Sequence, residues 1–421
     1  MNIGIIGLGD MGQLYAHSFS KAGYQVFGCD LPENAKSLSL IFEDNHLVNI
    51  CKSSKEVVEN SVYLIFSVET NKIESVVREL APYVRKGHVV AGQTSVKNPE
   101  VRAFKKYLND DVDIATLHSL HGPHVNPKGQ TLVAIPERIS SERFKEVLGV
   151  LSCMESKIEV LDSADVHDKM MADIQVVTHI GFESIGTSFM HRGIFPWESR
   201  LHSSGLDNVK LLLTLRIYSY KHHVYEGMAM QNPFSKQDVR AYAKAENDIF
   251  GLMISESKDE LYKLILEAKE KVFKGFPGSL MLNDELMREF SLYPPREHKA
   301  NSHLSLLAMV LTWARLGTSP YDNLICQTPP FKLRVGMAEY LFLNDELLQE
   351  SLEAALFDKS IRMDDLAFHT SVQEWAHIVE SGDQKGYSSH FERTKAFLAD
   401  RLEEGRRLSS MLIERINNEA G

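Results

Sequence analysis

Short apolar runs alternate with amphipathic helical segments through the first third of the chain. Six runs of strand length, rich in β-branched and aromatic residues, cover residues 2–6, 24–30, 62–68, 88–94, 113–118 and 131–136. Strand-like runs separated by helical stretches are typical of βαβ units, in which the strands pair in parallel. The pattern therefore predicts an α/β Rossmann domain with a doubly wound, mainly parallel sheet.

From about residue 163 the pattern changes to long helical periodicity without further βαβ units. Helices are predicted over residues 163–190, 208–233 and 235–253, followed by a linker over residues 274–302. Ser163 is a suitable N-cap for the first of these helices. The second part of the chain is therefore predicted to be all-α.

The order of the helical segments recurs after the linker. NSHLSLLAMVLTWARLG resembles the helix of His179, FKLRVGMAEYLFLNDE that of Arg216, and MDDLAFHTSVQEWAHIV resembles DVRAYAKAENDIFGLMI. Offsets of 118 to 126 residues suggest an internal duplication, although amphipathic helices of similar length also look alike by chance. The expected domains are a nucleotide domain at 1–162, a first helical copy at 163–277, and a linker with a second copy at 278–421.

The turn after the first apolar run reads GLGDMG. In a dinucleotide fold, Gly7 allows the tight turn, Gly9 lets the backbone approach a pyrophosphate, and Gly12 lets the helix pack closely on the strand. Asp30 follows 18 residues after the last glycine, where a carboxylate bonds the ribose hydroxyls of NAD. An NADP site favours a nearby arginine, but the following LPENAK supplies only Lys36. These residues alone therefore favour NAD.

Polar residues follow three of the predicted strands at their ends, in SVE (67–69), GQTSVK (92–97) and HSLHGPH (118–124). In parallel sheets, ligands bind at the carboxyl ends of the strands. The active site is therefore expected at this edge of the sheet. The residues expected to contact the cofactor are Gly7, Leu8, Gly9, Asp10, Met11, Gly12, Asp30, Ser67, Val68 and Thr94.

HSLHGPH places three histidines within seven residues. A zinc site needs converging imidazoles, and the H-x2-H-x2-H spacing in a turn with Gly122 and Pro123 does not bring them together. We therefore expect no metal. A neutral imidazole at the end of a central strand is suited to accept a proton, which favours His118 as the catalytic group. His121 and His124 are expected to be loop residues.

Charge and composition exclude several functional classes. The net charge of -11 argues against a nucleic-acid surface and requires local basic groups for any anionic substrate. The four cysteines have no paired spacing, which favours reduced thiols. The chain has no run of 18 apolar residues and no basic leader at its start, so neither a membrane span nor a targeting peptide is expected. We expect a cytoplasmic protein.

The motifs GLGDMG, GQTSVK, HSLHGP, HDKMMADIQVVTH and LRIYSYKHHVY together resemble those of the prephenate dehydrogenases, especially the fungal, NADP-dependent type. The resemblance covers nearly the whole chain. It implies oxidative decarboxylation of prephenate to 4-hydroxyphenylpyruvate with hydride transfer to NADP, in tyrosine biosynthesis; NAD stays open because of Asp30. The alternatives are an arogenate or hydroxyacid dehydrogenase of the same architecture, or an NAD(P)-sensing binding protein without catalysis.

The resemblance also implies catalytic roles. His118 matches the catalytic histidine of the family's H-P-M-x-G motif, here H-S-L-H-G with Ser119 in place of proline. Ser95 matches the serine of the family's G-S-V-K segment, although Thr94 replaces its glycine, and it is implied to orient His118 or share the substrate hydroxyl. Lys97, where a helix is expected to begin, is expected to meet solvent or a phosphate.

Three further residues are implied to bind the substrate. Arg216 matches the arginine that holds a substrate carboxylate, and His179 matches a histidine twelve residues after the His-Asp pair, here His167 and Asp168. His179 is implied to serve the second anionic end of prephenate. Gln175 stands where some bacterial members have serine.

In bacterial relatives the helical domains of two subunits interlock. Here both copies would lie on one chain, so the helix at 303–316 is expected to pack against the helix at 165–190. The protein would then be a monomer with an internal pseudo-dimer, or a homodimer through another surface.

Overall fold

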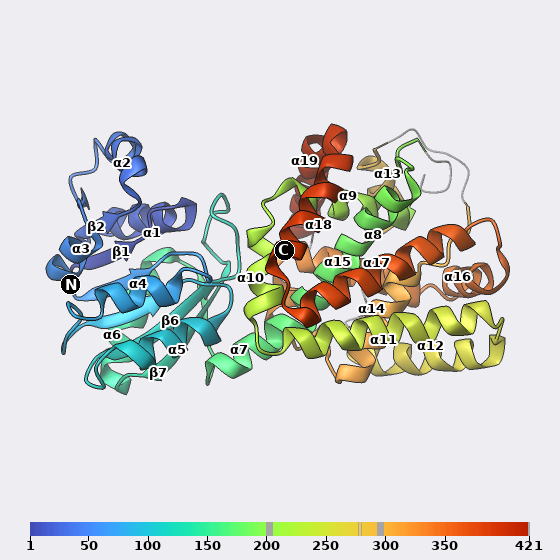
Figure 1. The fold of residues 1–421 in the computed structure, drawn as a ribbon, viewed down its shortest axis with the longest axis horizontal. Helices are drawn as coiled ribbons and strands as arrows, with labels where there is room; N and C mark the ends of the chain where they lie inside the picture. Colours follow the sequence, from blue (N-terminus) through green and yellow to red (C-terminus); the bar gives the residue numbers. More distant parts are fainter. Residues whose placement is uncertain (199–204, 277, 279, 293–298, 420–421) are drawn as a thin grey trace. The chain divides into compact units, whose positions relative to one another are not determined.

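The structure is a computed structural model, and it describes residues 1–198, 205–276, 278, 280–292 and 299–419 (Figure 1). The chain divides into two compact units. Unit 1 comprises Met1–Lys169 and Gln231–Pro233, and unit 2 comprises Met170–Met230 and Phe234–Gly421. Unit 1 thus extends beyond the predicted end of the nucleotide domain at 162. The division of unit 2 into two copies stays a prediction.

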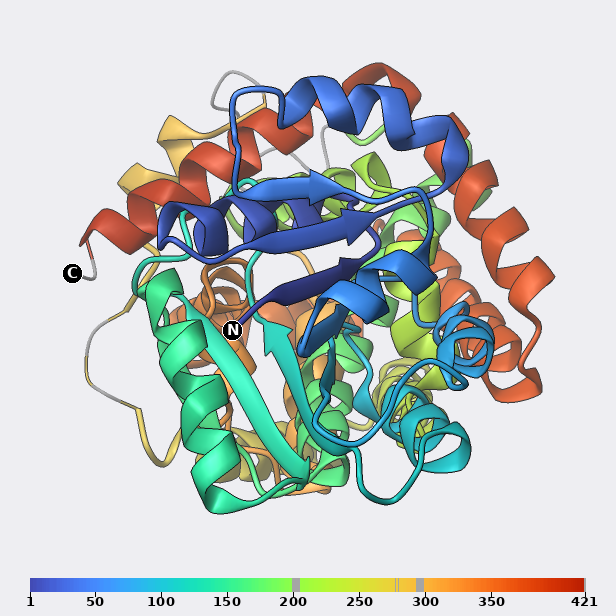
Figure 2. The same cartoon turned by 90° about the vertical axis from the view of Figure 1, so that its left-hand side faces the viewer.

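Unit 1 is built on an eight-stranded sheet of order β3-β2-β1-β4-β5-β6-β7-β8 (Figure 2). The strands are β1 (Ile3–Ile6), β2 (Val26–Cys29), β3 (Val48–Ile50), β4 (Tyr63–Phe66), β5 (Val89–Gly92), β6 (Asp113–Ser119), β7 (Thr131–Arg138) and β8 (Lys157–Val160). Neighbouring strands are parallel except for the antiparallel pair β6 and β7. The predicted mainly parallel, doubly wound sheet is confirmed.

Helices cover both faces of this sheet. They are α1 (Asp10–Lys21), α2 (Ala35–Ile41), α3 (Ser54–Asn60), α4 (Ile73–Leu80), α5 (Lys97–Tyr107) and α6 (Ser141–Leu151). Apolar side chains of α1 and α6, such as Phe19 and Val147, share one core with the strands. Those of α3, α4 and α5, such as Val77 and Phe104, form the core of the other face. Burial on both faces explains the nearly continuous apolar character of the strands.

Unit 2 is helical, as predicted. Its helices are α8 (Val177–Arg192), α9 (Gly205–Ser219), α10 (His223–Gln231), α11 (Ser235–Ile254), α12 (Lys258–Phe273), α13 (Asp284–Glu289), α14 (Leu304–Leu316), α15 (Pro329–Phe342), α16 (Asp345–Phe357), α17 (Arg362–Ser381), α18 (Gln384–Phe397) and α19 (Leu402–Glu419). None of the helices in the described part of the chain is long and apolar enough to cross a membrane.

Three predicted helical boundaries need correction. The helix predicted at 163–190 consists of α7 (Ala164–Met171), a π-helical turn (Ala172–Val176) and α8. The helix predicted at 208–233 is broken between α9 and α10, where the Ser219 hydroxyl bonds the carbonyl of Arg216. The predicted linker contains α13, whose first turn is capped by Asn283. Residues 277, 279 and 293–298 of that linker lie outside the described residues.

The helices of the two predicted copies cross over in unit 2. Helix α8 of the first copy packs along α17 of the second, and α14 of the second packs along α11 of the first (Figure 1). The indole nitrogen of Trp375 donates to Thr187 at 3.0 Å, and the Tyr242 hydroxyl donates to the Ser305 carbonyl at 3.5 Å. This exchange supports the predicted duplication, which itself stays a prediction.

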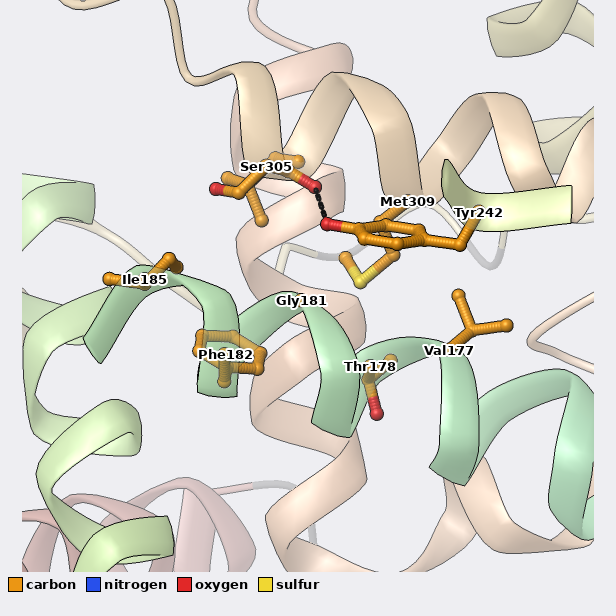
Figure 3. A pocket seen from close by; sticks show the side chains of 9 residues that line it. Val177, Thr178, Gly181, Phe182, Ile185, Tyr242, Ser305 and Met309 are labelled. Carbon is orange, nitrogen blue, oxygen red and sulfur yellow. Dashed lines mark hydrogen bonds between the residues drawn. The ribbon is translucent and has the colours of Figure 1, made fainter. Parts of the chain in front are cut away.

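Helix α14 also packs against α8, as expected for an internal pseudo-dimer. Side chains from α8, α11 and α14 line a small cavity between these helices (Figure 3). Gly181 permits this close approach, because a Cβ atom there would lie 2.8 Å from the Tyr242 hydroxyl. The predicted packing of the 303–316 helix on the 165–190 helix is confirmed.

A chain truncated after Lys274 is expected to aggregate. Truncation removes α14 and α17, and it thereby exposes the apolar surface of α8 and α11 that these helices cover. Gel filtration and the binding of an apolar dye, compared with the full chain, measure this. A soluble truncated monomer that unfolds cooperatively would contradict the interlocked packing.

Candidate active site

The glycine turn between β1 and α1 has the geometry of a phosphate cradle. Gly7 has a φ of +97°, and a Cβ atom there would lie 2.3 Å from the carbonyl oxygen of Ser67. A Cβ atom on Gly12 would lie 2.1 Å from the carbonyl oxygen of Gly7, whereas Gly9 borders open space. No side chain caps the N-terminus of α1. The residues present therefore fit a dinucleotide pyrophosphate on the helix N-terminus.

Asp30 bonds to the glycine turn. Its carboxylate accepts the backbone N–H of Leu8 at 2.6 Å, and also the N–H of Leu31 and the side-chain amide of Asn34, both at 2.8 Å. Lys36 is exposed on α2. Asp30 thus has a structural partner in the phosphate cradle that the sequence did not predict.

The other residues predicted to contact the cofactor divide into two groups. Asp10 and Met11 begin α1, and Ser67 and Val68 follow the end of β4. Thr94 instead turns its hydroxyl inward, to the carbonyl of Val96 and the carboxylate of Glu100, both at 2.6 Å. The side chain of Thr94 is buried, so only its backbone remains a candidate cofactor contact.

His118 lies at the end of β6 and contacts a second histidine. Its Nδ1 is 2.8 Å from Nε2 of His167, and Nδ1 of His167 is 2.8 Å from the Asp168 carboxylate. His118 keeps 8% of its surface exposed whereas His167 keeps none, so of the two only His118 can meet a substrate. In the described residues no hydrogen bond occupies Nε2 of His118. The group expected to be catalytic is therefore accessible at one nitrogen and bonded at the other.

Burial controls the charge of this histidine pair. It holds the pKa of His118 well below the usual value, and the charges of His167, Lys97 and His121 lower it further. Burial also lowers the pKa of His167, against the influence of Asp168. For Asp168, burial alone raises the pKa, but hydrogen bonds from His167 and from backbone N–H groups bring it below its usual value. At neutral pH the cluster is two neutral imidazoles and one carboxylate.

Lys97 does not meet solvent, and the expectation that it contacts a phosphate is wrong. Its ammonium group is completely buried and donates to Glu100 at 3.0 Å and to the carbonyl oxygens of Gly92 and Leu117 at 3.2 and 2.5 Å. Lys97 therefore joins the ends of β5 and β6. The physical reason is that its carboxylate partner, Glu100, is buried beside it.

Ser95 and Ser119 differ from their expected surroundings. Ser95 is half-buried in the turn before α5, and in the described chain no hydrogen bond joins it to His118. The partner that orients His118 is His167, while a role for Ser95 at the substrate hydroxyl stays a prediction. Ser119, which replaces a proline, shares a 2.8 Å hydrogen bond with Tyr15 of α1. His124 is exposed in the following loop, as expected.

In unit 2, a buried cluster surrounds His179. Its ring packs edge-on against Tyr225 and stacks with Phe331, at centroid distances of 4.7 and 5.8 Å. The guanidinium of Arg334 lies 4.2 Å from the centre of the Phe331 ring and donates to the Thr178 hydroxyl at 2.5 Å. Burial and the charge of Arg334 hold the pKa of His179 well below its usual value. His179 is therefore neutral and serves as a hydrogen-bonding group.

Arg334 is a buried cation without a paired carboxylate among the described residues. It is 4% exposed, its Nε has no hydrogen-bond partner, and burial lowers its pKa to about 9. Nearby Glu183 does not cancel the charge, because burial raises the pKa of this carboxyl group to about 8 despite a hydrogen bond from Tyr387. An unpaired buried guanidinium is costly unless an anion compensates it. Arg334 therefore has the properties of an anion-binding group.

The other predicted substrate residues lie in different settings. Arg216 is half-buried on α9 and donates to the Ser410 hydroxyl at 2.6 Å, with its guanidinium over the Tyr220 ring. Gln175 is buried in the π-helical turn, and its side-chain oxygen has no partner among the described residues. Such turns often mark functional positions. The echo of LRIY by LRVG was the sequence signal for Arg334, which was not proposed as a site residue.

Two family models match the chain, and both describe parts of 6-phosphogluconate dehydrogenase. Residues 176–418 match a model of the 6-phosphogluconate dehydrogenase C-terminal domain, and residues 2–117 match the NAD binding domain of 6-phosphogluconate dehydrogenase. These matches agree with the helical unit and with the sheet that carries the glycine turn.

Whole-length relatives are found among fungal proteins. A Saccharomyces cerevisiae protein named prephenate dehydrogenase (NADP+) is 41% identical, covering 98% of this chain and 93% of that protein. A Schizosaccharomyces pombe protein named probable prephenate dehydrogenase (NADP+) is 40% identical, covering 98% of this chain and 97% of that protein. The solved structure of prephenate dehydrogenase from A. aeolicus, with hydroxyphenyl propionate and NAD+, has a TM-score of 0.54 at 17% identity, covering 65% of this chain and 98% of that one. The structural likeness shows the fold.

Proposed function

The chain belongs to the family of NADP-dependent prephenate dehydrogenases, and from this membership we propose how its residues carry out the reaction. The reaction converts prephenate to 4-hydroxyphenylpyruvate and carbon dioxide, in tyrosine biosynthesis. It requires a proton acceptor at the C4 hydroxyl, cationic groups for two carboxylates, and exclusion of water from the reacting face. NADP, when bound, accepts the hydride from C4.

The observation that carries the proposal is the neutral, buried His118 with one accessible nitrogen. A general base must be unprotonated at working pH and must reach the proton it removes. Burial keeps the pKa of His118 low, and His167 holds the opposite side of the ring. We assign the removal of the hydroxyl proton to Nε2 of His118, with Ser95 as a candidate second contact to that hydroxyl.

Arg334 is the candidate for one carboxylate of prephenate. A planar guanidinium binds a carboxylate through two parallel hydrogen bonds, and the Nε of Arg334 has no protein partner among the described residues. His179 and Gln175 of the same helical stretch supply neutral hydrogen-bonding groups. Arg216 contributes positive charge within electrostatic range of Arg334. The negatively charged chain thus provides its substrate with locally basic surroundings.

The cofactor is assigned to the glycine turn and its neighbours. Gly7, Gly9 and Gly12 shape a cradle that a side chain would fill, and the amide groups of the α1 N-terminus point their dipole at a pyrophosphate. Lys36 is the candidate partner of the 2'-phosphate, since the segment after β2 has no arginine up to that residue.

Replacing Asp30 by asparagine is expected to shift cofactor preference further toward NADP. The amide keeps an acceptor for the Leu8 N–H but removes a negative charge, and like charges about 4 Å apart in water repel by about 1 kcal/mol. The ratio of kcat/KM for NADP to that for NAD should therefore rise about 5- to 10-fold. Asp30→Ala, which also removes the acceptor, is the control and should weaken both cofactors. An unchanged ratio in the asparagine variant would mean that Asp30 serves the glycine turn alone.

The substrate is tested by comparing kcat/KM for prephenate and arogenate, each with NADP and NAD. Arogenate carries an ammonium group in place of the side-chain keto group, and the near-neutral Glu183 is a poor partner for it. We expect prephenate with NADP to have the highest kcat/KM of the four pairs. A higher value for arogenate would reassign the substrate within the same fold.

We further propose a cytoplasmic protein that supplies both helical copies from one chain. All four cysteines are free thiols, as is usual in a reducing compartment. Because Arg334 and His179 come from the two predicted copies of a single chain, the substrate-binding groups of unit 2 need no second subunit. The protein is proposed to act as a monomer or as a homodimer through another surface.

A further inference from the structure

A second buried imidazole lies behind the proton acceptor. His118 on β6 contacts His167 on α7, and His167 contacts Asp168, with both distances at 2.8 Å. All three residues belong to unit 1. Because His167 has no exposed surface, any effect that it has on the reaction is exerted through His118.

The hydrogen bonds of Asp168 determine which nitrogen of His167 carries a proton. The carboxylate accepts the backbone N–H groups of Lys97 and Asn98 at 2.8 Å, and the side-chain amide of Asn98 at 3.0 Å. These two N–H groups begin α5, where the helix dipole favours an anion. An ionised carboxylate can only accept hydrogen bonds. Nδ1 of His167 therefore donates to Asp168.

The tautomer of His118 follows from this. A neutral imidazole has one donor and one acceptor nitrogen, so Nε2 of His167 accepts and Nδ1 of His118 donates. Nε2 of His118 is left with its lone pair, which is the form a base needs. We propose that His167 and Asp168 are positioning residues that select this tautomer and share the proton that His118 takes up. The proton-sharing part of this proposal rests on the proposed function.

The groups around the pair keep it neutral between turnovers. Lys97 of α5 and His121 of the following loop face His118, and both disfavour a proton there. Lys97 is itself paired with Glu100 at 3.0 Å. Asp168 is therefore the carboxylate in direct contact with the histidine pair, and it contacts His167 rather than His118.

The relay accounts for the proton balance of the reaction. As the hydride leaves C4 for NADP, the hydroxyl oxygen forms a C=O bond and its proton moves to Nε2 of His118. The Nδ1 proton of His118 can then move to Nε2 of His167, which brings the positive charge beside Asp168. When the bond to the ring carboxylate breaks, carbon dioxide leaves and its electron pair enters the ring. The resulting phenolate takes the proton back, so the relay stores one proton between two steps.

Two variants test the relay by kinetics. Asp168→Asn and His167→Asn are expected to lower kcat about 10²- to 10⁴-fold, because in a comparable triad loss of the carboxylate charge costs about 10⁴-fold through the wrong tautomer. KM for prephenate and Kd for NADP should stay unchanged. The matched control is Asp165→Asn. Asp165 also bonds Asn98, at 2.9 Å, but does not touch the histidines, so wild-type kcat is expected.

Nitrogen-15 NMR of histidine-labelled full-length protein tests the tautomer directly. The chain has 17 histidines, and the signals of His118 and His167 are identified by their loss in His118→Asn and His167→Asn. In the wild type at neutral pH, His118 should show a protonated Nδ1 and an unprotonated Nε2, and Asp168→Asn should lose this pattern. A protonated Nε2 in the wild type, or wild-type kcat in both relay variants, overturns the proposal. A wild type with the expected tautomer that forms no NADPH from prephenate would instead contradict the proposed function, while tautomer selection would stand.

Discussion

Replacing His118 by asparagine is expected to lower kcat for prephenate about 10²- to 10⁴-fold, the usual contribution of a general base. Asparagine is smaller than histidine and uncharged, so it removes the proton acceptor without adding a charge to the buried end of β6. The glycine turn does not involve this side chain, so the Kd for NADP should stay near that of the wild type. Steady-state kinetics and cofactor titration measure the two quantities.

The pH profile of the wild type is the companion measurement. Only neutral His118 can accept the proton, so kcat/KM should fall as the pH drops through its pKa. Burial moves this pKa well below the usual 6.5, and the acid limb should therefore lie below pH 6.5. An asparagine variant with more than half of the wild-type kcat would remove His118 from the mechanism.

Replacing Arg334 by methionine is expected to raise KM for prephenate more than any other single change in unit 2. Truncating one partner of a buried charge pair costs about 2–5 kcal/mol, which corresponds to roughly 30- to several-thousand-fold. Methionine keeps much of the volume above the Phe331 ring but cannot bind a carboxylate. The measurement is KM and kcat for prephenate, with the melting temperature determined in parallel.

Arg216→Met is the matched control for this change. Arg216 is half-buried and bonded to Ser410, and interactions of exposed charges contribute about 1 kcal/mol or less, so at most about a fivefold loss is expected. A larger rise in KM for Arg216→Met than for Arg334→Met would restore the assignment made from the sequence. A lower melting temperature with unchanged KM in Arg334→Met would make Arg334 structural.

The fold of unit 1 could be predicted because its sequence pattern has few alternative interpretations. Strands buried on both faces leave continuous apolar runs, and a GxGxxG turn between two such runs is specific in that context. The pattern did not distinguish the antiparallel β7 from its parallel neighbours, because an apolar run does not encode strand direction. The short strands β3 and β8 were missed, since only three and four residues form each of them.

The site was only partly predictable because its decisive contacts are tertiary. His118 could be identified from its place at a strand end, but its contact with His167 joins residues 49 positions apart. Lys97 was expected near phosphate because the sequence does not show that Glu100 is buried beside it. Arg216 and Arg334 occupy matching motifs, and burial distinguishes them only after the helices have packed.

The most direct test of the account is the product balance of the full-length protein with prephenate and NADP. Absorbance at 340 nm follows NADPH, while 4-hydroxyphenylpyruvate and carbon dioxide are measured in the same reaction. The account predicts that the three products form in equal amounts with no net release of protons, and that His118→Asn slows all three together. No NADPH from prephenate, or NADPH formed without carbon dioxide, would contradict it.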